Sequence, residues 1–153
     1  MAGPRERGTK IPKPMARVFT GLHGFVYRIS KGKVGGRFGG GEAGGQVVIL
    51  GTTGAKTGKA RTSPLLAFPH GDDWVVIASF SGHDFHPGWY HNLVASPEAT
   101  LTIGAETSAV RARFTQGAER DELWERVSTA YTDYQKYERV TDREIPVVVL
   151  EAV

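Results

Sequence analysis

Residues 52–63 concentrate charge, hydroxyl groups and glycines in one short stretch, TTGAKTGKARTS. Lys56, Lys59 and Arg61 supply three positive charges, and Gly54 and Gly58 allow the backbone to turn tightly. Backbone N–H groups, hydroxyl donors and cations gathered in one turn are suited to holding a phosphate or a carboxylate. The stretch therefore predicts an anion-binding turn, and an ordinary solvent-exposed polar hairpin is the alternative.

The same stretch differs from a nucleotide-binding P-loop at two positions. Counted from Gly58-Lys59, that pattern requires a glycine where this chain has Thr53 and a hydroxyl residue where it has Ala60. The stretch also lies between two expected strands, whereas a P-loop precedes a helix. A P-loop nucleotide site is therefore not expected here.

A second group of chemically useful residues runs over positions 78–92, ASFSGHDFHPGWYHN. It covers a strand end, a loop and a helix start, where backbone N–H groups can face an anion or a ring carbonyl and Trp89 can flank a planar ring. The loop also holds potential metal ligands, namely His83, Asp84, His86 and His91. Their spacing matches no metal-site pattern, so we expect surface polar groups or helix caps and no metal.

The third group consists of three tyrosines at intervals of three, Tyr131, Tyr134 and Tyr137. This spacing places them on one face of a helix that begins after residue 130. A buried phenol needs a hydrogen-bond partner, so the set suits the wall of a pocket, with core packing as the alternative. Asp142 and Arg143, just beyond, are interpreted as a surface pair.

Strands must position these groups. Six short stretches have the β-branched or alternating pattern of strands: 46–53, 61–69, 72–80, 99–103, 108–114 and 146–150. His70-Gly71 indicates a hairpin turn, and helical patterns cover 86–95 and 118–130, the second with Leu123, Trp124 and Val127 facing inward. Because long helical crossovers are few, this order favours an antiparallel barrel over a parallel α/β sheet.

The chain has 153 residues and no cysteine, which predicts one self-sufficient core and excludes disulfides and thiolate metal sites. It has neither an apolar run long enough to span a membrane nor a signal-peptide core, so an intracellular location is expected. The net charge is +3, and residues 1–40 hold nine of the 19 Lys and Arg side chains with a single Glu. Basic residues confined to one end do not predict nucleic-acid binding.

The first 40 residues are expected to lie apart from a barrel domain at 41–153. Residues 1–13 are expected to be a basic arm, and apolar residues at helical spacing over 15–29 predict an amphipathic helix. This helix would lie on the barrel or, alternatively, on a membrane surface. Residues 31–45 contain eight glycines and are interpreted as a connector.

Taken together, four stretches resemble one known family. They are TTGAKTGKARTSPL, HPGWYHNL, YTDYQKY and TDREIPVVVLE, in this order. Sequence of this kind closely resembles the deazaflavin-dependent nitroreductase family, split β-barrel oxidoreductases of actinobacterial type that bind coenzyme F420, over about residues 18–151. The resemblance implies a mainly β fold with helices (α+β), an antiparallel split β-barrel like that of FMN-binding proteins.

The resemblance also implies a coenzyme site. The turn that grips the phosphate and acidic tail of F420 would consist of Ala55, Lys56, Thr57 and Arg61. The two strands beside the deazaflavin would contribute Thr62, Ser63, Pro64, Leu65, Leu66, Ile77, Ala78, Ser79 and Phe80. The helix start that closes the site would contribute Gly88, Trp89, Tyr90, His91 and Asn92. The catalytic group would comprise Tyr134, which faces both coenzyme and acceptor, with Tyr131, Tyr137 and Ser79.

The function implied is hydride transfer from reduced F420 to a quinone, an activated alkene or a nitroaromatic. Leu66 and Phe80 stand where another family member has tyrosine and lysine, so a more apolar pocket is expected and nitroimidazole reduction is not implied. Alternatives are a split-barrel protein that binds FMN, or one that binds F420 without turnover. The enzyme is expected in the cytoplasm. A lipid quinone as acceptor would be consistent with contact between residues 15–29 and the inner face of the membrane. A dimer is the oligomeric state considered.

Overall fold

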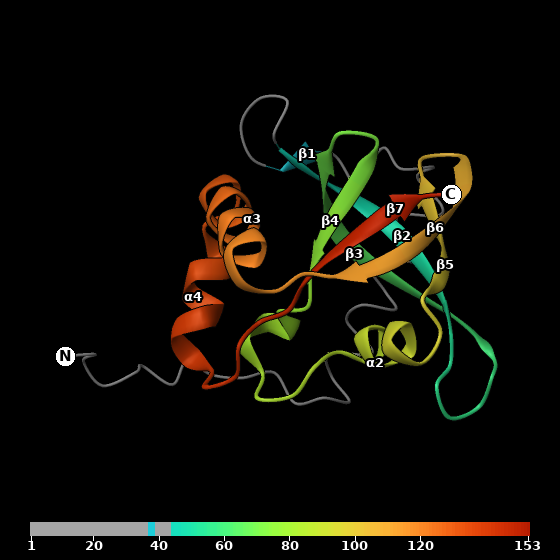
Figure 1. The fold of residues 1–153 in the computed structure, drawn as a ribbon, viewed down its shortest axis with the longest axis horizontal. Helices are drawn as coiled ribbons and strands as arrows, with labels where there is room; N and C mark the ends of the chain where they lie inside the picture. Colours follow the sequence, from blue (N-terminus) through green and yellow to red (C-terminus); the bar gives the residue numbers. More distant parts are fainter. Residues whose placement is uncertain (1–36, 39–43) are drawn as a thin grey trace.

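The computed structural model describes residues 37–38 and 44–153, and within them seven antiparallel strands form one sheet (Figure 1). The strand order is β1-β2-β3-β4-β7-β6-β5. In chain order the elements are β1 (Arg37–Phe38), β2 (Gly45–Thr53), β3 (Ala60–His70), β4 (Asp73–Ile77), the 3-10 helix η2 (Phe80–Gly82), α2 (Gly88–Ala95), β5 (Glu98–Ile103), β6 (Glu106–Phe114), α3 (Gly117–Ala130), α4 (Asp133–Val140) and β7 (Val147–Ala152).

The sheet closes on itself because β2 pairs with β5 as well as with β3. In this pairing Leu50 lies opposite Leu101 and Gly51 opposite Thr100. A Cβ atom at Gly51 would overlap the Thr100 hydroxyl, so glycine is what allows the two strands to approach here. The result is an antiparallel barrel of six strands with β1 added at the edge of β2, and the predicted barrel is confirmed.

Alternate residues of the strands fill the interior of the barrel, as the period of two in a strand requires. The buried members of this interior cluster are Val48, Leu50, Ala67, Val76, Ala78, Trp89, Leu93, Leu101, Val110, Ala112, Val148 and Leu150. Trp89 and Leu93 belong to α2, which lies across the lower end of the barrel in Figure 1. Helix α2 therefore closes this end with apolar side chains.

A second cluster lies on the outside of the barrel, where α3 and α4 cover β3, β4 and β7 (Figure 1). Its buried members are Phe68, Val75, Ile77, Leu123, Trp124, Val127, Tyr134, Ile145, Val147 and Val149. Leu123, Trp124 and Val127 point inward as predicted. Leu66 packs against this outer cluster and also against Val47 and Ile49, the buried outer residues of β2.

Three expected element boundaries were wrong, and one strand was not expected. Strand β4 ends at Ile77, and Phe80, which was expected to end this strand, has a left-handed backbone conformation (φ 44°) that no strand accommodates. Helix α2 begins at Gly88 rather than at 86, and α4 begins only at Asp133, so Tyr131 precedes it. The glycine-rich stretch, taken as a connector, supplies β1.

The expected N-terminal arm and the helix over 15–29 lie outside the described residues. Among the helices that the structure describes, none is long and apolar enough to cross a membrane.

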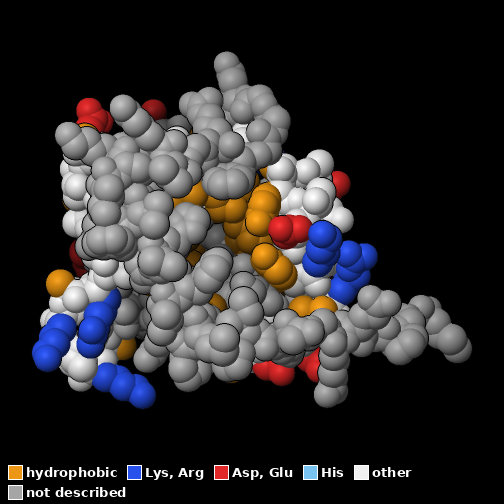
Figure 2. Space-filling view, turned by 180° about the vertical axis from the view of Figure 1, so that it is seen from behind, with side chains coloured by type: hydrophobic (Ala, Val, Ile, Leu, Met, Phe, Trp, Pro, Cys, Tyr) orange, Lys and Arg blue, Asp and Glu red, His pale blue; other side chains and the backbone are white. Residues whose placement is uncertain are grey.

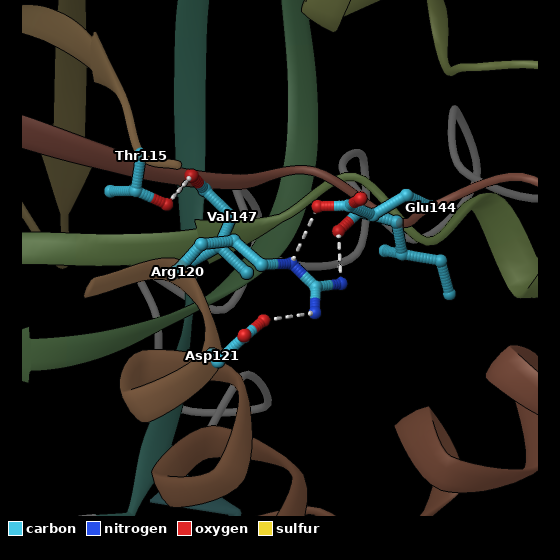
Figure 3. Close-up of polar contacts among 6 residues, drawn as sticks. Thr115, Arg120, Asp121, Glu144 and Val147 are labelled. Atoms are coloured by element: carbon cyan, nitrogen blue, oxygen red, sulfur yellow. Dashed lines mark hydrogen bonds and ion pairs between the residues drawn. The ribbon is translucent and has the colours of Figure 1, made fainter. Parts of the chain in front are cut away.

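One buried arginine joins α3 to the segment leading into β7 (Figure 3). The Arg120 side chain is 9% exposed, and its Nη2 donates a 2.7 Å hydrogen bond to the carbonyl oxygen of Ile145. Its Nε lies 3.4 Å from Glu144 Oε1, and its guanidinium sits 5.0 Å from the ring centre of Trp124. Helix α3 is thus fixed to the barrel by charge as well as by apolar contact.

We predict that Arg120→Met lowers the free energy of unfolding by about 2 kcal/mol, because a buried carbonyl loses a charge-assisted hydrogen bond. The matched control is Arg111→Met, which removes an ion pair whose side chains are 57% and 69% exposed and should change stability by less than about 0.5 kcal/mol. Urea unfolding of both variants measures the difference, and equal losses would contradict this role for Arg120.

Candidate functional site

The β2–β3 turn, at the lower right of Figure 1, is held by its own backbone. The amide of Gly54 donates to the Lys59 carbonyl and that of Gly58 to the Gly54 carbonyl, both at 2.8 Å, and the Lys59 amide donates to Thr57 Oγ1 at 3.2 Å. The amides of Lys56 and Thr57 donate to no residue that the structure describes. They remain available to a ligand.

Asn92 ties this turn to α2. Its Oδ1 accepts a 2.9 Å hydrogen bond from the amide of Ala55, and its Nδ2 donates a 3.1 Å bond to Thr52 Oγ1. Both ends of the side-chain amide are thus engaged within the protein. Asn92 supports the turn rather than offering a free group to a ligand, which the sequence pattern alone did not distinguish.

The cations of the turn are exposed: Lys56, Lys59 and Arg61. Within residues 37–38 and 44–153 no carboxylate lies within ion-pair distance of any of them. In the view from behind, Lys and Arg side chains gather at the lower left, where the β2–β3 turn lies, and hydrophobic side chains gather at the centre (Figure 2). Among the described residues the turn thus presents positive charge that no carboxylate neutralises, as an anion site requires.

Strand β3 leads from the turn to the apolar outer face. Pro64 and Leu66 pair with Ile49 and Val47, whose side chains belong to the outer face. Their neighbours Ser63 and Leu65 pair with Leu50 and Val48 of the interior cluster and so lie on the other face. Only every second residue of the run 62–66 can therefore present its side chain to a ligand on the outer face.

Successive side chains at the end of β4 also alternate between the outer face and the interior of the barrel. Ile77 belongs to the outer cluster, whereas Ala78 is buried in the interior and its amide donates a 3.0 Å bond to the carbonyl of Pro146. Ser79 is 8% exposed, and Phe80 packs its ring against Phe85 with a centroid distance of 5.5 Å. These residues begin the loop that leads to α2.

The three tyrosines do gather, although they do not share one helix. Tyr134 is 4% exposed, and its ring centre lies 5.0 Å from that of Tyr131, 6.1 Å from that of Tyr137 and 6.0 Å from that of Phe68. Burial raises the pKa of Tyr134 far above its usual value, and burial with a hydrogen bond to Asp133 does the same for the pKa of Tyr131. Both phenols therefore stay protonated and can act as hydrogen-bond donors.

Helix α2 holds the remaining predicted residues. Trp89 packs into the barrel interior, so its ring is not a wall for a ligand on the outer face. Tyr90 packs edge-on against Phe114, and His91 is exposed. Among the described residues, no group of three or more acidic or histidine side chains is arranged to hold a metal ion.

Arg143 was missed by the sequence-based interpretation, which took it as half of a surface pair. It is half-buried and donates to two carbonyl oxygens of the loop after β4, Nη2 to Ser79 at 2.7 Å and Nε to His83 at 2.9 Å. Its Nη1 lies 3.1 Å from His86 Nδ1, which must accept because an arginine only donates. About 60 residues separate these partners, so no local pattern signals the contact.

The family model for F420H2-dependent quinone reductases matches residues 21–152. The chain belongs to the F420H2-dependent quinone reductase family. It is therefore an oxidoreductase that uses coenzyme F420, as the sequence resemblance implied.

An F420H2-dependent quinone reductase of Mycobacterium tuberculosis is 38% identical over 132 residues, which cover 84% of this chain and 87% of that protein. The solved structure of an F420H2-dependent reductase is 37% identical with a TM-score of 0.63, covering 69% of this chain and 93% of that one. A second solved structure, described only as a domain-swapped dimer, is 31% identical with a TM-score of 0.64, covering 91% of this chain and all of that one.

We predict that Asn92→Ala weakens F420 binding about tenfold, because the two hydrogen bonds that hold the turn are each worth about 1 kcal/mol. The control is Val94→Ala, an exposed apolar residue of the same helix that should leave the affinity unchanged. Fluorescence titration of the coenzyme measures the affinity of both variants. If Asn92→Ala bound F420 with wild-type affinity, the turn would not be part of the binding site.

Proposed function

We propose that this protein transfers a hydride from F420H2 to a quinone, with the coenzyme on the outer face of the barrel between the β2–β3 turn and the tyrosines around α4. The observation that carries the proposal is that one strand, β3, joins the exposed cations of the turn to the apolar outer face. Arg61 and Leu66 are separated by about 17 Å along this strand. The Arg61 side chain starts from the same face as Ser63 and Leu65, and its Nε lies near Gly54, so it would meet the anionic tail at the turn and not on the outer face. Charge at one end and apolar surface at the other match a ligand with an anionic tail and a flat ring.

The turn fits the tail by its donor chemistry. Lys56 and Arg61 offer charge, Lys56 and Thr57 offer amides without an acceptor among the described residues, and Asn92 keeps the turn in place. Ala55 contributes to the frame, since its amide is already bonded to Asn92. Each charge-assisted hydrogen bond to an anion is worth about 1.5–3 kcal/mol, so two or three of them account for firm binding.

The outer face fits the ring end. Pro64 and Leu66 are its half-buried apolar side chains along β3, and the buried Ile77 of β4 precedes the loop that begins at residue 78. Reduced F420, when bound, supplies a hydride to an electron-poor acceptor. The residues around it keep water away and orient the acceptor, and the leucine and phenylalanine at positions 66 and 80 favour an apolar quinone over a charged acceptor.

Tyr134 is proposed to donate a hydrogen bond to the acceptor at the deazaflavin end of the site. Tyr131 and Tyr137 pack against its ring. Burial raises the pKa of Tyr134, so its phenol stays a hydrogen-bond donor throughout the neutral pH range. Since the residue is 4% exposed, the proposal requires that its hydroxyl border the ring end of the site. The Ser79 carbonyl is engaged by Arg143, so this residue contributes to the shape of the site through a fixed backbone.

Two finer points are proposed from the sequence alone. A peripheral membrane contact through residues 15–29 would bring a lipid quinone to the site, and a dimer is consistent with the domain-swapped arrangement of one relative. Neither rests on described residues of this chain.

The experiment for the proposed function is an anaerobic turnover screen. F420H2 is mixed with the protein and a menaquinone analogue, an enone or a nitroaromatic, and the absorbance of the oxidised coenzyme is followed. We expect the quinone to be reduced fastest and reduced FMN not to replace F420H2. Equal turnover with FMN, or no turnover with any quinone, would contradict the proposal.

We predict that the double variant Lys56→Ala/Arg61→Ala binds F420 about a hundredfold or more weakly, since two charge-assisted contacts are lost. Turnover at saturating coenzyme should change far less, because both residues lie at the tail end. Lys136→Ala, whose side chain on α4 is 66% exposed, is the control for a general loss of positive charge. An unchanged dissociation constant in the double variant would place the anion site elsewhere.

We predict that Tyr134→Phe binds F420 as wild type does but turns over more slowly, by roughly tenfold to a thousandfold. Only the hydroxyl is lost, so the ring contacts with Phe68 and Trp124 remain. Steady-state kinetics and a melting curve separate the two effects. A normal kcat with every acceptor would leave Tyr134 as a packing residue.

A further inference from the structure

The loop that leaves β4 carries a strained backbone. Phe80 has φ 44°, a conformation that aromatic residues rarely adopt. Gly82, with φ 77°, faces α4 so closely that a Cβ there would overlap Val140 and lie 3.1 Å from the Tyr137 carbonyl oxygen. The loop is thus bent sharply and pressed against the helix that holds Tyr134 and Tyr137.

Arg143 is the group that spans this bend. Its guanidinium donates to the Ser79 carbonyl before the strained residue and to the His83 carbonyl after it, at 2.7 and 2.9 Å. The third contact, to His86 Nδ1 at 3.1 Å, ties the loop to the start of α2. Thr141 assists, because its hydroxyl lies 3.4 Å from the same His83 carbonyl oxygen and accepts from the amide of Arg143.

We propose that Arg143 is a positioning residue of the enzyme, whose guanidinium holds the loop 79–86 in the bent form that sets Ser79 and Phe80 at the ring end of the site. The expected effect on turnover rests on the proposed function. The expected effect on the conformation of the loop rests on the geometry alone. Strained backbone persists where its surroundings hold it, and it gathers at functional sites.

The geometry requires the planar fork of arginine. Three acceptors lie around one guanidinium, and the ammonium of a lysine is a single point that cannot reach all three in the same directions. Arg143→Lys should therefore behave like Arg143→Ala rather than like wild type.

The contact with His86 adds a pH dependence. His86 can accept from Arg143 only while it is neutral, and burial, together with the charges of Arg143 and His91, lowers its pKa. The other group facing it is Tyr90, whose ring centre is 4.6 Å away, and the ring centre of His91 lies at 5.8 Å. The charge of Asp84 acts on Arg143. The contact is intact at neutral pH and is lost as acid protonates His86 below its usual range.

The kinetic test compares Arg143→Ala and Arg143→Lys with Arg139→Ala, an exposed arginine near the end of α4. We expect both Arg143 variants to lower kcat for the quinone by roughly tenfold or more while the F420 dissociation constant changes less than about threefold, and millimolar methylguanidine to restore part of the activity of Arg143→Ala. A variant that only melts earlier, with wild-type kcat and KM, would overturn the proposal.

The structural test needs no coenzyme. The amides of Gly82 and His83 close the 3-10 turn on the carbonyls of Ser79 and Phe80, at 3.0 and 3.1 Å. We expect their hydrogen exchange to accelerate in Arg143→Ala but not in Arg139→Ala. Unchanged exchange overturns the positioning role whether or not the protein reduces quinones, and faster exchange supports it even if the proposed acceptor is wrong.

A milder variant covers the case in which Arg143→Ala does not fold. His86→Asn keeps an acceptor near the position of Nδ1 but does not titrate. We expect wild-type kcat to decline as acid protonates His86, and His86→Asn to show no such decline. An acidic decline identical to that of wild type would contradict the role given to the Arg143–His86 contact.

Discussion

The pairing of β2 with β5 is the constraint on which the rest of the molecule depends. It closes the barrel at Leu50 and Gly51, and closure divides every strand into residues that face the interior and residues that face outward. The interior is filled by apolar side chains and closed at one end by Trp89 and Leu93 of α2. Binding chemistry is therefore left to the outer face and to the turns.

Two polar side chains set the shape of that outer site, one at each end. Asn92 fixes the β2–β3 turn to α2, and Arg143 fixes the loop after β4 between α2 and α4. Each uses its hydrogen-bonding groups on the protein backbone or on neighbouring side chains. Lys56, proposed to meet the coenzyme tail, is thus carried on the turn that Asn92 holds, and the loop that Arg143 holds packs against α4, the helix of Tyr134.

Much of the fold could be predicted from the sequence, because strand and helix patterns are local. The strands around residues 46–53 and 108–114, the helix 118–130 and the turn at His70-Gly71 were all found within a few residues of their observed ends. The basic turn was recognised from its composition, and the family from four motifs, and the family match confirms the second of these.

What could not be predicted depends on contacts between distant residues. Strand β4 ends at Ile77, and the loop that follows it, with the left-handed Phe80, is hydrogen-bonded to Arg143, more than 60 residues away. The run 62–66 was assigned whole to the coenzyme because its composition does not show that Ser63 and Leu65 face the interior side of the strand. Trp89 was assigned to a ring wall because only closure of the barrel shows that α2 packs into its end.

A crystal structure with oxidised F420 bound tests the central claim most directly. The account predicts the coenzyme phosphate and acidic tail at the β2–β3 turn, within hydrogen-bonding distance of Lys56 or Arg61, and the deazaflavin on the outer face beside Leu66 and the tyrosines. A deazaflavin bound at the end of the barrel against Trp89, or a tail bound away from the turn, would contradict it.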